Sequence, residues 1–135
     1  MSKVILLGDE AVARGAIDAG ISAAYAYPGT PSTEIYQAIE DHAKEHGFNV
    51  RGMWSTNEKV ALEEGVGVSY AGRRAMVSMK HVGLNVAADP CMNVAVSGAH
   101  GGLVVVVADD PSMHSSQNEQ DSRYFADFAM VPCLE

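Results

Sequence analysis

The chain has 135 residues, of which 47% are hydrophobic and 7% aromatic, and its formal net charge is −8 at pH 7. This length fits a single domain that can bury a real hydrophobic core. The negative charge argues against nucleic acid or an anionic membrane surface as a partner. The longest fully apolar run, Leu103 to Ala108, is too short to cross a bilayer.

Apolar and helical segments alternate along the chain. In order, we expect a strand at 4–7, a helix at 10–19, a strand at 22–27, a helix at 32–45, a strand at 49–55, a helix at 57–71, a strand at 75–79, a helix at 90–97, a strand at 103–108 and a helix at 123–128. The continuous valines of the last strand predict full burial, with helices on both faces of the sheet. Residues 129–134 begin another strand-like run in which the chain stops, so we expect a fragment of a longer polypeptide.

This alternation predicts an α/β fold: a single domain over residues 1–135 with a doubly wound, mainly parallel open sheet. In such a sheet, ligands bind outside the carboxyl ends of the strands. Those ends carry Tyr27–Thr30, Ser55–Glu58, Lys80–Gly83 and Asp109–Gln117 here. We therefore expect the functional groups to gather on this one rim.

The cysteines, Cys91 and Cys133, are far apart and form no Cys-x-x-Cys pair. This spacing is typical of reduced thiols in a cytoplasmic protein, and we expect both side chains to be buried as small hydrophobes. His81, His100 and His114 have no ligand spacing for zinc, so we expect no metal site.

The segment YAYPGTPSTEI, residues 25–35, contains two prolines and a glycine within four residues, which makes a rigid corner. Thr30 is expected as a helix N-cap and Pro31 as the first helical residue. A well-built helix start would explain these residues alone. Pro28 and Gly29 would also bring the backbone close to a ligand over the rim, and a hydroxyl-rich helix start favours an anionic or polar ligand.

Glu58, in the segment NEKVALEEG, falls in the first turn of a helix that Asn57 can cap. Glu58 either complements the helix dipole or reaches a ligand. The following acids, Glu63 and Glu64, are expected in solvent. The glycines at positions 65 and 67 do not complete a G-x-G-x-x-G motif, because position 70 is tyrosine, so we expect them to permit close helix packing.

His81 and Arg123 stand near the other strand ends. In SMKHVGLNVAADP, residues 78–90, His81 is expected just before a glycine turn, where it could contact a ligand, carry a proton or be only a loop residue. Arg123 could bind a carboxylate in a two-pronged manner or form a surface ion pair with a nearby acid. The residues alone do not decide between these roles.

Taken together, these stretches resemble the 2-oxoacid:ferredoxin oxidoreductases, which use thiamine diphosphate. LLGDEAVARGAIDAG, YAYPGTPSTEI, NEKVALEEGVGVSYAGRRA, SMKHVGLNVAADP and HSSQNEQDSR stand in that family's order and cover essentially the whole chain. The likeness is greatest to the alpha subunits of its indolepyruvate-oxidising branch. The resemblance implies a pyrimidine-binding (PYR) domain, in which the rigid corner forms one wall of the active site.

By this resemblance, Glu58 is the catalytic glutamate that hydrogen-bonds N1′ of the cofactor's aminopyrimidine. The substrate would be contacted by Thr30 and Arg123. The cofactor site would also include Pro28, Gly29, Thr30 and His81.

The resemblance further implies an enzyme that oxidatively decarboxylates indolepyruvate or another arylpyruvate to acyl-CoA and reduces ferredoxin, with the isolated domain inactive. Thiamine diphosphate would be shared with a diphosphate-binding domain of the same or a second subunit. A beta subunit, ferredoxin and CoA would be further partners. Mg²⁺ and 4Fe–4S clusters would belong to the rest of the parent enzyme, because the chain has no GDG motif and no cysteine cluster.

We also expect homo-oligomers, because a rim made for a partner leaves apolar area exposed around Met53, Trp54 and residues 81–92. Three alternatives stay open: another 2-oxoacid such as pyruvate or 2-oxoglutarate, a non-catalytic α/β module that binds a small anion, and an assembly domain. Glu58 discriminates the enzyme domain from the anion-binding module, since a simple anion site gains nothing from a buried carboxylate.

Overall fold

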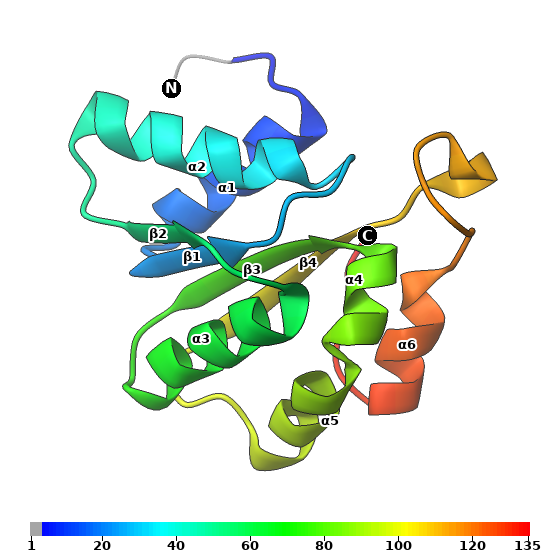
Figure 1. Ribbon diagram of the computed structural model, residues 1–135. Coiled ribbons are helices and arrows are strands. Elements are labelled where there is room, and N and C mark those ends of the chain that lie inside the picture. Colours follow the sequence, from blue (N-terminus) through cyan, green and yellow to red (C-terminus); the bar gives the residue numbers. More distant parts are fainter. Residues whose placement is uncertain (1–3) are drawn as a thin grey trace.

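The computed structural model describes residues 4–135 and has an α/β fold, in which a four-stranded parallel sheet lies between two layers of helices (Figure 1). The strands are β1 (Ala23–Ala26), β2 (Arg51–Trp54), β3 (Ala75–Lys80) and β4 (Leu103–Ala108). The helices are α1 (Gly8–Asp18), α2 (Thr33–His46), α3 (Glu58–Tyr70), α4 (His81–Val86), α5 (Ala88–Ser97) and α6 (Ser122–Ala129), with a 3-10 turn η1 (Pro111–Met113).

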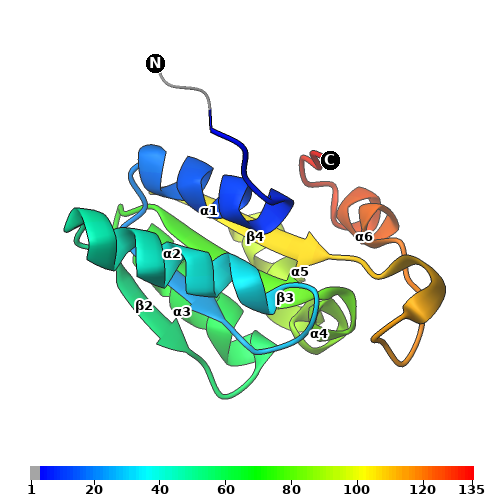
Figure 2. The ribbon, with the colours of Figure 1, turned by 90° about the horizontal axis from the view of Figure 1, so that it is seen from above.

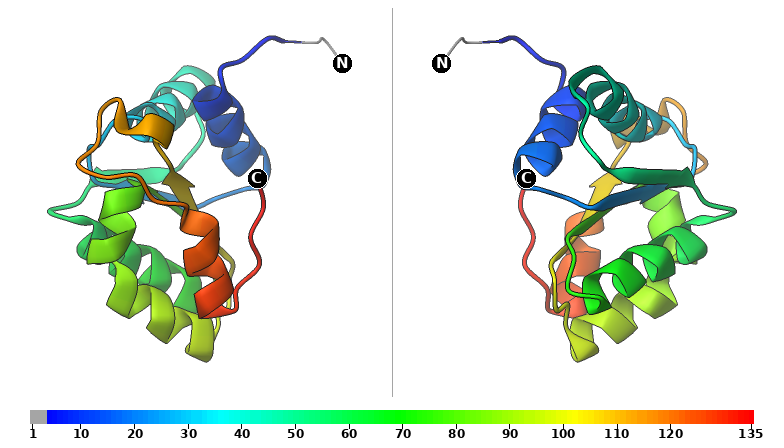
Figure 3. Two further views of the ribbon diagram at one scale, coloured as in Figure 1. Left: turned by 90° about the vertical axis from the view of Figure 1, so that its right-hand side faces the viewer. Right: turned by 90° about the vertical axis from the view of Figure 1, so that its left-hand side faces the viewer.

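The strands lie in the order β2-β1-β3-β4. Helices α1 and α2 cover one face of the sheet and α3, α4 and α5 the other, as the side views show (Figure 3). The predicted doubly wound parallel sheet with helices on both faces is therefore confirmed. Because the chain passes from β2 on one side of β1 to β3 on the other, the topological switch point lies between β1 and β3.

Alternate side chains of the two central strands enter two separate cores. Ala24 and Ala26 of β1 join Met76 of β3 in the core under α1 and α2. Tyr25 of β1 joins Val77 in the core under α3 and α4. This period of two is what a strand covered on both faces requires.

The prediction of a strand at residues 4–7 is wrong. This segment is exposed and has no regular structure, although it is apolar. Its last residue, Leu7, precedes α1, and the Leu7 N–H donates to the Glu10 carboxylate at 2.8 Å. An apolar run becomes a strand only where a neighbouring strand offers its hydrogen-bonding groups. The strand-like run expected from residue 129 is also absent, since Ala129 closes α6 and residues 131–135 have no regular structure.

Residues 103–108 form the expected strand, but the prediction of full burial is wrong. β4 is an edge strand that pairs with β3 alone, and Val104 is 58% exposed. The run of valines therefore indicates a strand but not its burial. Burial depends on the position of the strand in the sheet.

The glycine turn expected after His81 is a helix instead, since α4 begins at His81 and includes Gly83. Close packing is confirmed at Gly65, where a Cβ would lie 2.5 Å from Cγ2 of Val77. At Gly67 the expectation is wrong, because a Cβ there would meet no atom within 4 Å.

The cysteines differ in their surroundings. Cys91 is half-buried, and this burial raises the pKa of its thiol. Cys133 is exposed, so the expectation that both are buried is wrong. Within residues 4–135, no helix combines the length and the apolar character that a membrane span needs.

Candidate functional site

The connections that follow β1, β2, β3 and β4 all lie at the carboxyl end of the sheet. Figure 2 shows the connection after β1 and the long loop after β4 at this same end. The rim therefore brings together residues that are far apart in sequence, as expected of a parallel sheet.

Short hydrogen bonds fix the corner between β1 and α2. The Gly29 N–H donates to the Thr33 hydroxyl at 2.8 Å, and the Gly29 carbonyl accepts from both the N–H and the hydroxyl of Ser32 at 2.7 Å. Ser32 occupies the N-cap position and Thr33 opens the helix. The predictions of Thr30 as N-cap and Pro31 as first helical residue are therefore wrong.

Thr30 is consequently free of any capping role, and it is exposed on the corner. The corner itself rests on the end of β3. A Cβ at Gly29 would lie 3.4 Å from Cβ of Lys80, so the corner backbone approaches the switch point closely. This placement leaves the Thr30 hydroxyl available to a ligand over the rim.

Glu58 opens α3, and the predicted cap is confirmed because the Asn57 side chain accepts from the Val60 N–H at 2.9 Å. Glu58 is half-buried and lies against Gly83 of α4. Among residues 4–135, no protein group hydrogen-bonds to the Glu58 carboxylate. Such a carboxylate retains its full capacity to accept a hydrogen bond from a ligand.

The expectation that Glu63 and Glu64 both point into solvent is right for Glu63 only. Glu64 is half-buried and accepts a hydrogen bond of 2.5 Å from the hydroxyl of Ser55. Ser55 follows β2 directly and is itself buried. This contact joins the end of β2 to α3.

Two buried polar residues stand where β3 meets α4: Lys80 is the last residue of β3 and His81 the first of α4. Lys80 Nζ donates to the Ser115 carbonyl at 2.5 Å. His81 Nε2 lies 3.0 Å from the carbonyl of Asn118, and since a carbonyl only accepts, Nε2 carries the hydrogen. His81 Nδ1 is buried without a protein partner in the described part of the chain. A buried unpaired acceptor costs about 1–3 kcal/mol, so a donor that reached it would recover this free energy.

The loop after β4 is held in place by Asp110, which is buried. Its carboxylate accepts from the Ser116 hydroxyl at 2.7 Å and from the N–H and hydroxyl of Ser115 at 2.8 and 3.1 Å. These hydrogen bonds, led by that of Ser116, lower the pKa of Asp110 to about 2. The Ser115 hydroxyl also lies 3.4 Å from the Thr30 carbonyl. Ser115 thus connects the loop, the corner and Lys80.

Sequence analysis did not single out Asp110 or Ser115. The available signal was an aspartate followed by serines after a strand, a pattern typical of side chains that bond their own loop. A second contact holds the loop to α4, where the side-chain amides of Asn85 and Gln120 donate hydrogen bonds to each other at 2.8 and 3.0 Å.

Arg123 lies at the start of α6 and is engaged by two carboxylates. It makes a two-pronged contact with Asp121, at 2.8 Å from Nε and 2.7 Å from Nη2, and Nη1 donates to Glu135 at 2.7 Å. The hydrogen bond with Asp121 raises the pKa of Arg123 and lowers the pKa of Asp121. Of the two roles considered for Arg123, the surface ion pair is the one present in this structure.

A doubly wound parallel domain with unpaired polar groups at its switch point belongs to the α/β domains that bind ligands at their carboxyl rim. Residues 14–127 match the family described as pyruvate flavodoxin/ferredoxin oxidoreductase, thiamine diphosphate-binding. The chain belongs to this family. The matched region contains Thr30, Glu58, His81 and Arg123.

Individual relatives agree with this assignment. The chain is 56% identical to indolepyruvate oxidoreductase subunit IorA of Archaeoglobus fulgidus, covering 98% of this chain and 22% of the relative. It is also 56% identical to the subunit of that name from Pyrococcus horikoshii, covering 98% of this chain and 20% of the relative. The chain therefore spans about a fifth of the length of these relatives.

Among solved structures, the chain resembles the 2-oxoglutarate:ferredoxin oxidoreductase of Magnetococcus marinus, a structure with 2-oxoglutarate, coenzyme A and succinyl-CoA bound. The TM-score is 0.75 and the identity 26%, over 91% of this chain and 21% of that one. The family and its fold thus agree with the resemblance found in the sequence.

Proposed function

We propose that this chain is the pyrimidine-binding domain of an indolepyruvate:ferredoxin oxidoreductase, with thiamine diphosphate bound against Glu58 at the rim. The observation that carries the proposal is the half-buried Glu58 carboxylate, which has no protein partner among the described residues and faces α4. The 56% identity to the IorA subunits supports indolepyruvate, or another arylpyruvate, as the substrate class.

Glu58 would hold a proton at N1′ of the aminopyrimidine, which requires a carboxylate that can accept and share a proton. The bound cofactor supplies an electron sink for decarboxylation of a 2-oxoacid. His81 Nδ1 is a second unpaired acceptor of the rim and fits a donor group of a bound molecule. The corner of Pro28, Gly29 and Thr30 would form a wall of the site.

The residues proposed to contact the substrate are Thr30 and Arg123. Thr30 fits the role because its side chain is not used in the helix cap. Arg123 would first have to exchange Asp121 or Glu135 for the substrate carboxylate, because both occupy its guanidinium now. Thr30 is therefore the better supported of the two.

The remaining parts of the parent enzyme are proposed from the family alone. A diphosphate-binding domain, of the same or a second subunit, would hold Mg²⁺ and the diphosphate. A beta subunit, 4Fe–4S clusters, ferredoxin and CoA would complete the reaction. A cytoplasmic location is supported by the two free cysteines, Cys91 and Cys133.

The test is Glu58→Gln in the complete enzyme. We expect thiamine diphosphate affinity to be largely retained and exchange of the cofactor C2 proton to slow by about 10²–10⁴-fold, the usual scale of general acid–base catalysis. Quenched-flow exchange followed by NMR measures this rate. If Glu58 serves only the helix dipole, the variant loses about 0.3–1 kcal/mol of stability and keeps its exchange rate, which would contradict the proposal.

A second candidate function has the same reaction chemistry but a different substrate. The likeness to the 2-oxoglutarate enzyme of Magnetococcus marinus favours an aliphatic 2-oxoacid as the alternative. Turnover of indolepyruvate, pyruvate and 2-oxoglutarate by the complete enzyme decides between them. A clear preference for either aliphatic acid would reject the arylpyruvate assignment and leave the role of Glu58 intact.

A further inference from the structure

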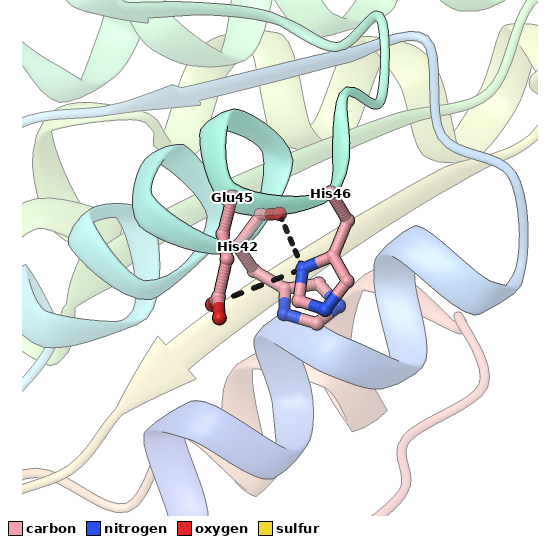
Figure 4. A group of neighbouring side chains, drawn as sticks. All are labelled: His42, Glu45 and His46. Carbon is pink, nitrogen blue, oxygen red and sulfur yellow. Dashed lines mark hydrogen bonds and ion pairs between the residues drawn. The ribbon is translucent and has the colours of Figure 1, made fainter.

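The last two turns of α2 carry two histidines and a glutamate on one side of the helix. His42, Glu45 and His46 each offer one ligand atom, and these atoms all lie within 4.8 Å of one another (Figure 4). The imidazole rings of His42 and His46, one helical turn apart, have centroids 4.1 Å apart. This group lies outside the rim, because α2 begins at the rim and runs to the opposite end of the sheet.

We propose that this group is a binding site for a divalent transition metal ion of the Zn²⁺ or Ni²⁺ type. Imidazole nitrogen is the preferred ligand of these ions, and a carboxylate oxygen can complete the set. Ca²⁺ and Mg²⁺ are disfavoured, because they need mostly oxygen ligands. Zinc–ligand bonds are about 2.0–2.2 Å long, so the three side chains must rotate inward to close on the ion.

The tautomer of His46 leaves one ring nitrogen for a metal ion. Its Nδ1 lies 3.1 Å from the carbonyl of His42 and 3.8 Å from Oε2 of Glu45, and because a carbonyl only accepts, Nδ1 carries the hydrogen. The lone pair of the neutral ring is then on Nε2, and the Glu45 side chain, which now faces Nδ1, must turn toward Nε2 to share an ion with it. A metal-bound histidine commonly donates its other ring N–H to a carbonyl in this way, which fixes the tautomer and the ring.

Phe48 restricts both rings further. Its ring centroid lies 5.9 Å from that of His42 and 6.0 Å from that of His46, in stacked arrangements. Side chains that are already ordered lose less conformational entropy when they bind. The site is therefore partly organised before an ion arrives.

The dipole of α2 also favours the binding of a cation at this end of the helix. His42 and His46 lie in the last turns of α2, which ends at Gly47 in the left-handed conformation. The C-terminal end of a helix carries partial negative charge and attracts cations.

The spacing H-x-x-E-H also occurs in a class of zinc peptidases. Here the glutamate and one histidine are exposed, so we assign ion binding and no reaction to the group.

Isothermal titration of the purified protein with ZnCl₂ and, separately, NiCl₂ tests this site. We expect one ion per chain, with affinity at least about tenfold lower in His42→Ala and in His46→Ala, because loss of even an outer partner of a metal ligand costs about 10–100-fold. His100→Ala and His114→Ala are matched controls, because both are exposed histidines outside the group, and they should leave the affinity unchanged. MgCl₂ should show no such site.

Amide NMR of the same protein locates the ion independently of affinity. Zn²⁺ should shift the resonances of residues 42–48 and leave the rim unchanged, and these shifts should be lost in the His42→Ala/His46→Ala double variant. Circular dichroism verifies that the variants are folded. No stoichiometric binding in the wild type, or unchanged binding in the folded double variant, would overturn the proposal without affecting the role of Glu58.

Discussion

The carboxylate of Glu58 at the start of α3 rests directly against Gly83 of α4. A Cβ at Gly83 would lie 2.5 Å from both Cγ and Oε1 of Glu58. Real Cβ atoms essentially never come so close, so any side chain at position 83 would displace the glutamate. The missing side chain at Gly83 therefore leaves the space that the proposed catalytic acid occupies, although the two residues are 25 positions apart in sequence.

Gly83→Ala should therefore impair the site more than the fold. The atoms it would meet belong to the flexible end of Glu58, which can rotate away, while alanine in a helix is favoured over glycine by about 0.8–1.0 kcal/mol. We expect a stable variant whose C2 proton exchange in the complete enzyme is slower than in the wild type. Chemical denaturation and the exchange rate are the two measurements. Wild-type exchange in a folded Gly83→Ala variant would show that Gly83 does not position Glu58.

Alanine substitutions at Gly65 and Gly67 of α3 should change the stability of the protein in opposite directions. A Cβ at Gly65 would lie 2.5 Å from Cγ2 of Val77 in the buried strand β3, whereas one at Gly67 would meet no atom within 4 Å. Gly65→Ala should therefore destabilise the protein by about 1–3 kcal/mol through overpacking. Gly67→Ala should stabilise it by about 1 kcal/mol through helix propensity. Urea denaturation compares them, and a shift of the same sign in both would contradict this packing.

The loop after β4 should loosen at low pH. The pKa of Asp110 is lowered from 3.8 to about 2 by hydrogen bonds from Ser116 and Ser115, so its contribution to stability is present above pH 3.8 and is lost as the pH falls toward 2. Hydrogen exchange of the Ser115 amide, followed by NMR over this range, should show protection lost near pH 2. Asp110→Ala, which removes the accepting oxygens, should lose this protection already at neutral pH. Protection that persists in Asp110→Ala would show that another contact holds the loop.

The isolated chain should self-associate through its rim and β2. Met53 on this edge strand is 39% exposed, and an exposed apolar surface next to an unpaired strand edge favours association. Light scattering at increasing concentration measures the mass, and Met53→Glu should shift it toward the monomer. Val104→Glu is the control and should have less effect, because Val104 lies near the amino end of β4 and so away from the rim, whereas Met53 lies near the carboxyl end of β2. A wild-type chain that stays monomeric at high concentration would refute the expectation.

The sequence by itself determined most of the elements and the polar motifs at the ends of the strands. Strands β1, β3 and β4, helices α2 and α3, and the Asn57 cap follow from local spacing and side-chain chemistry. The position of Glu58 at a strand end, and hence at the rim, follows from the alternation of strands and helices. These features depend on residues a few positions apart, which is why they can be recognised without a structure.

Only the tertiary structure decided which of these elements are neighbours. It left residues 4–7 unpaired, placed β4 at an edge, and started α2 at Thr33 instead of earlier. It also set Gly83 against Glu58 and brought Ser115 to Lys80. Such contacts join residues tens of positions apart, and they are selected by the competition of all segments for the same core and the same hydrogen-bond partners, which no short stretch of sequence specifies.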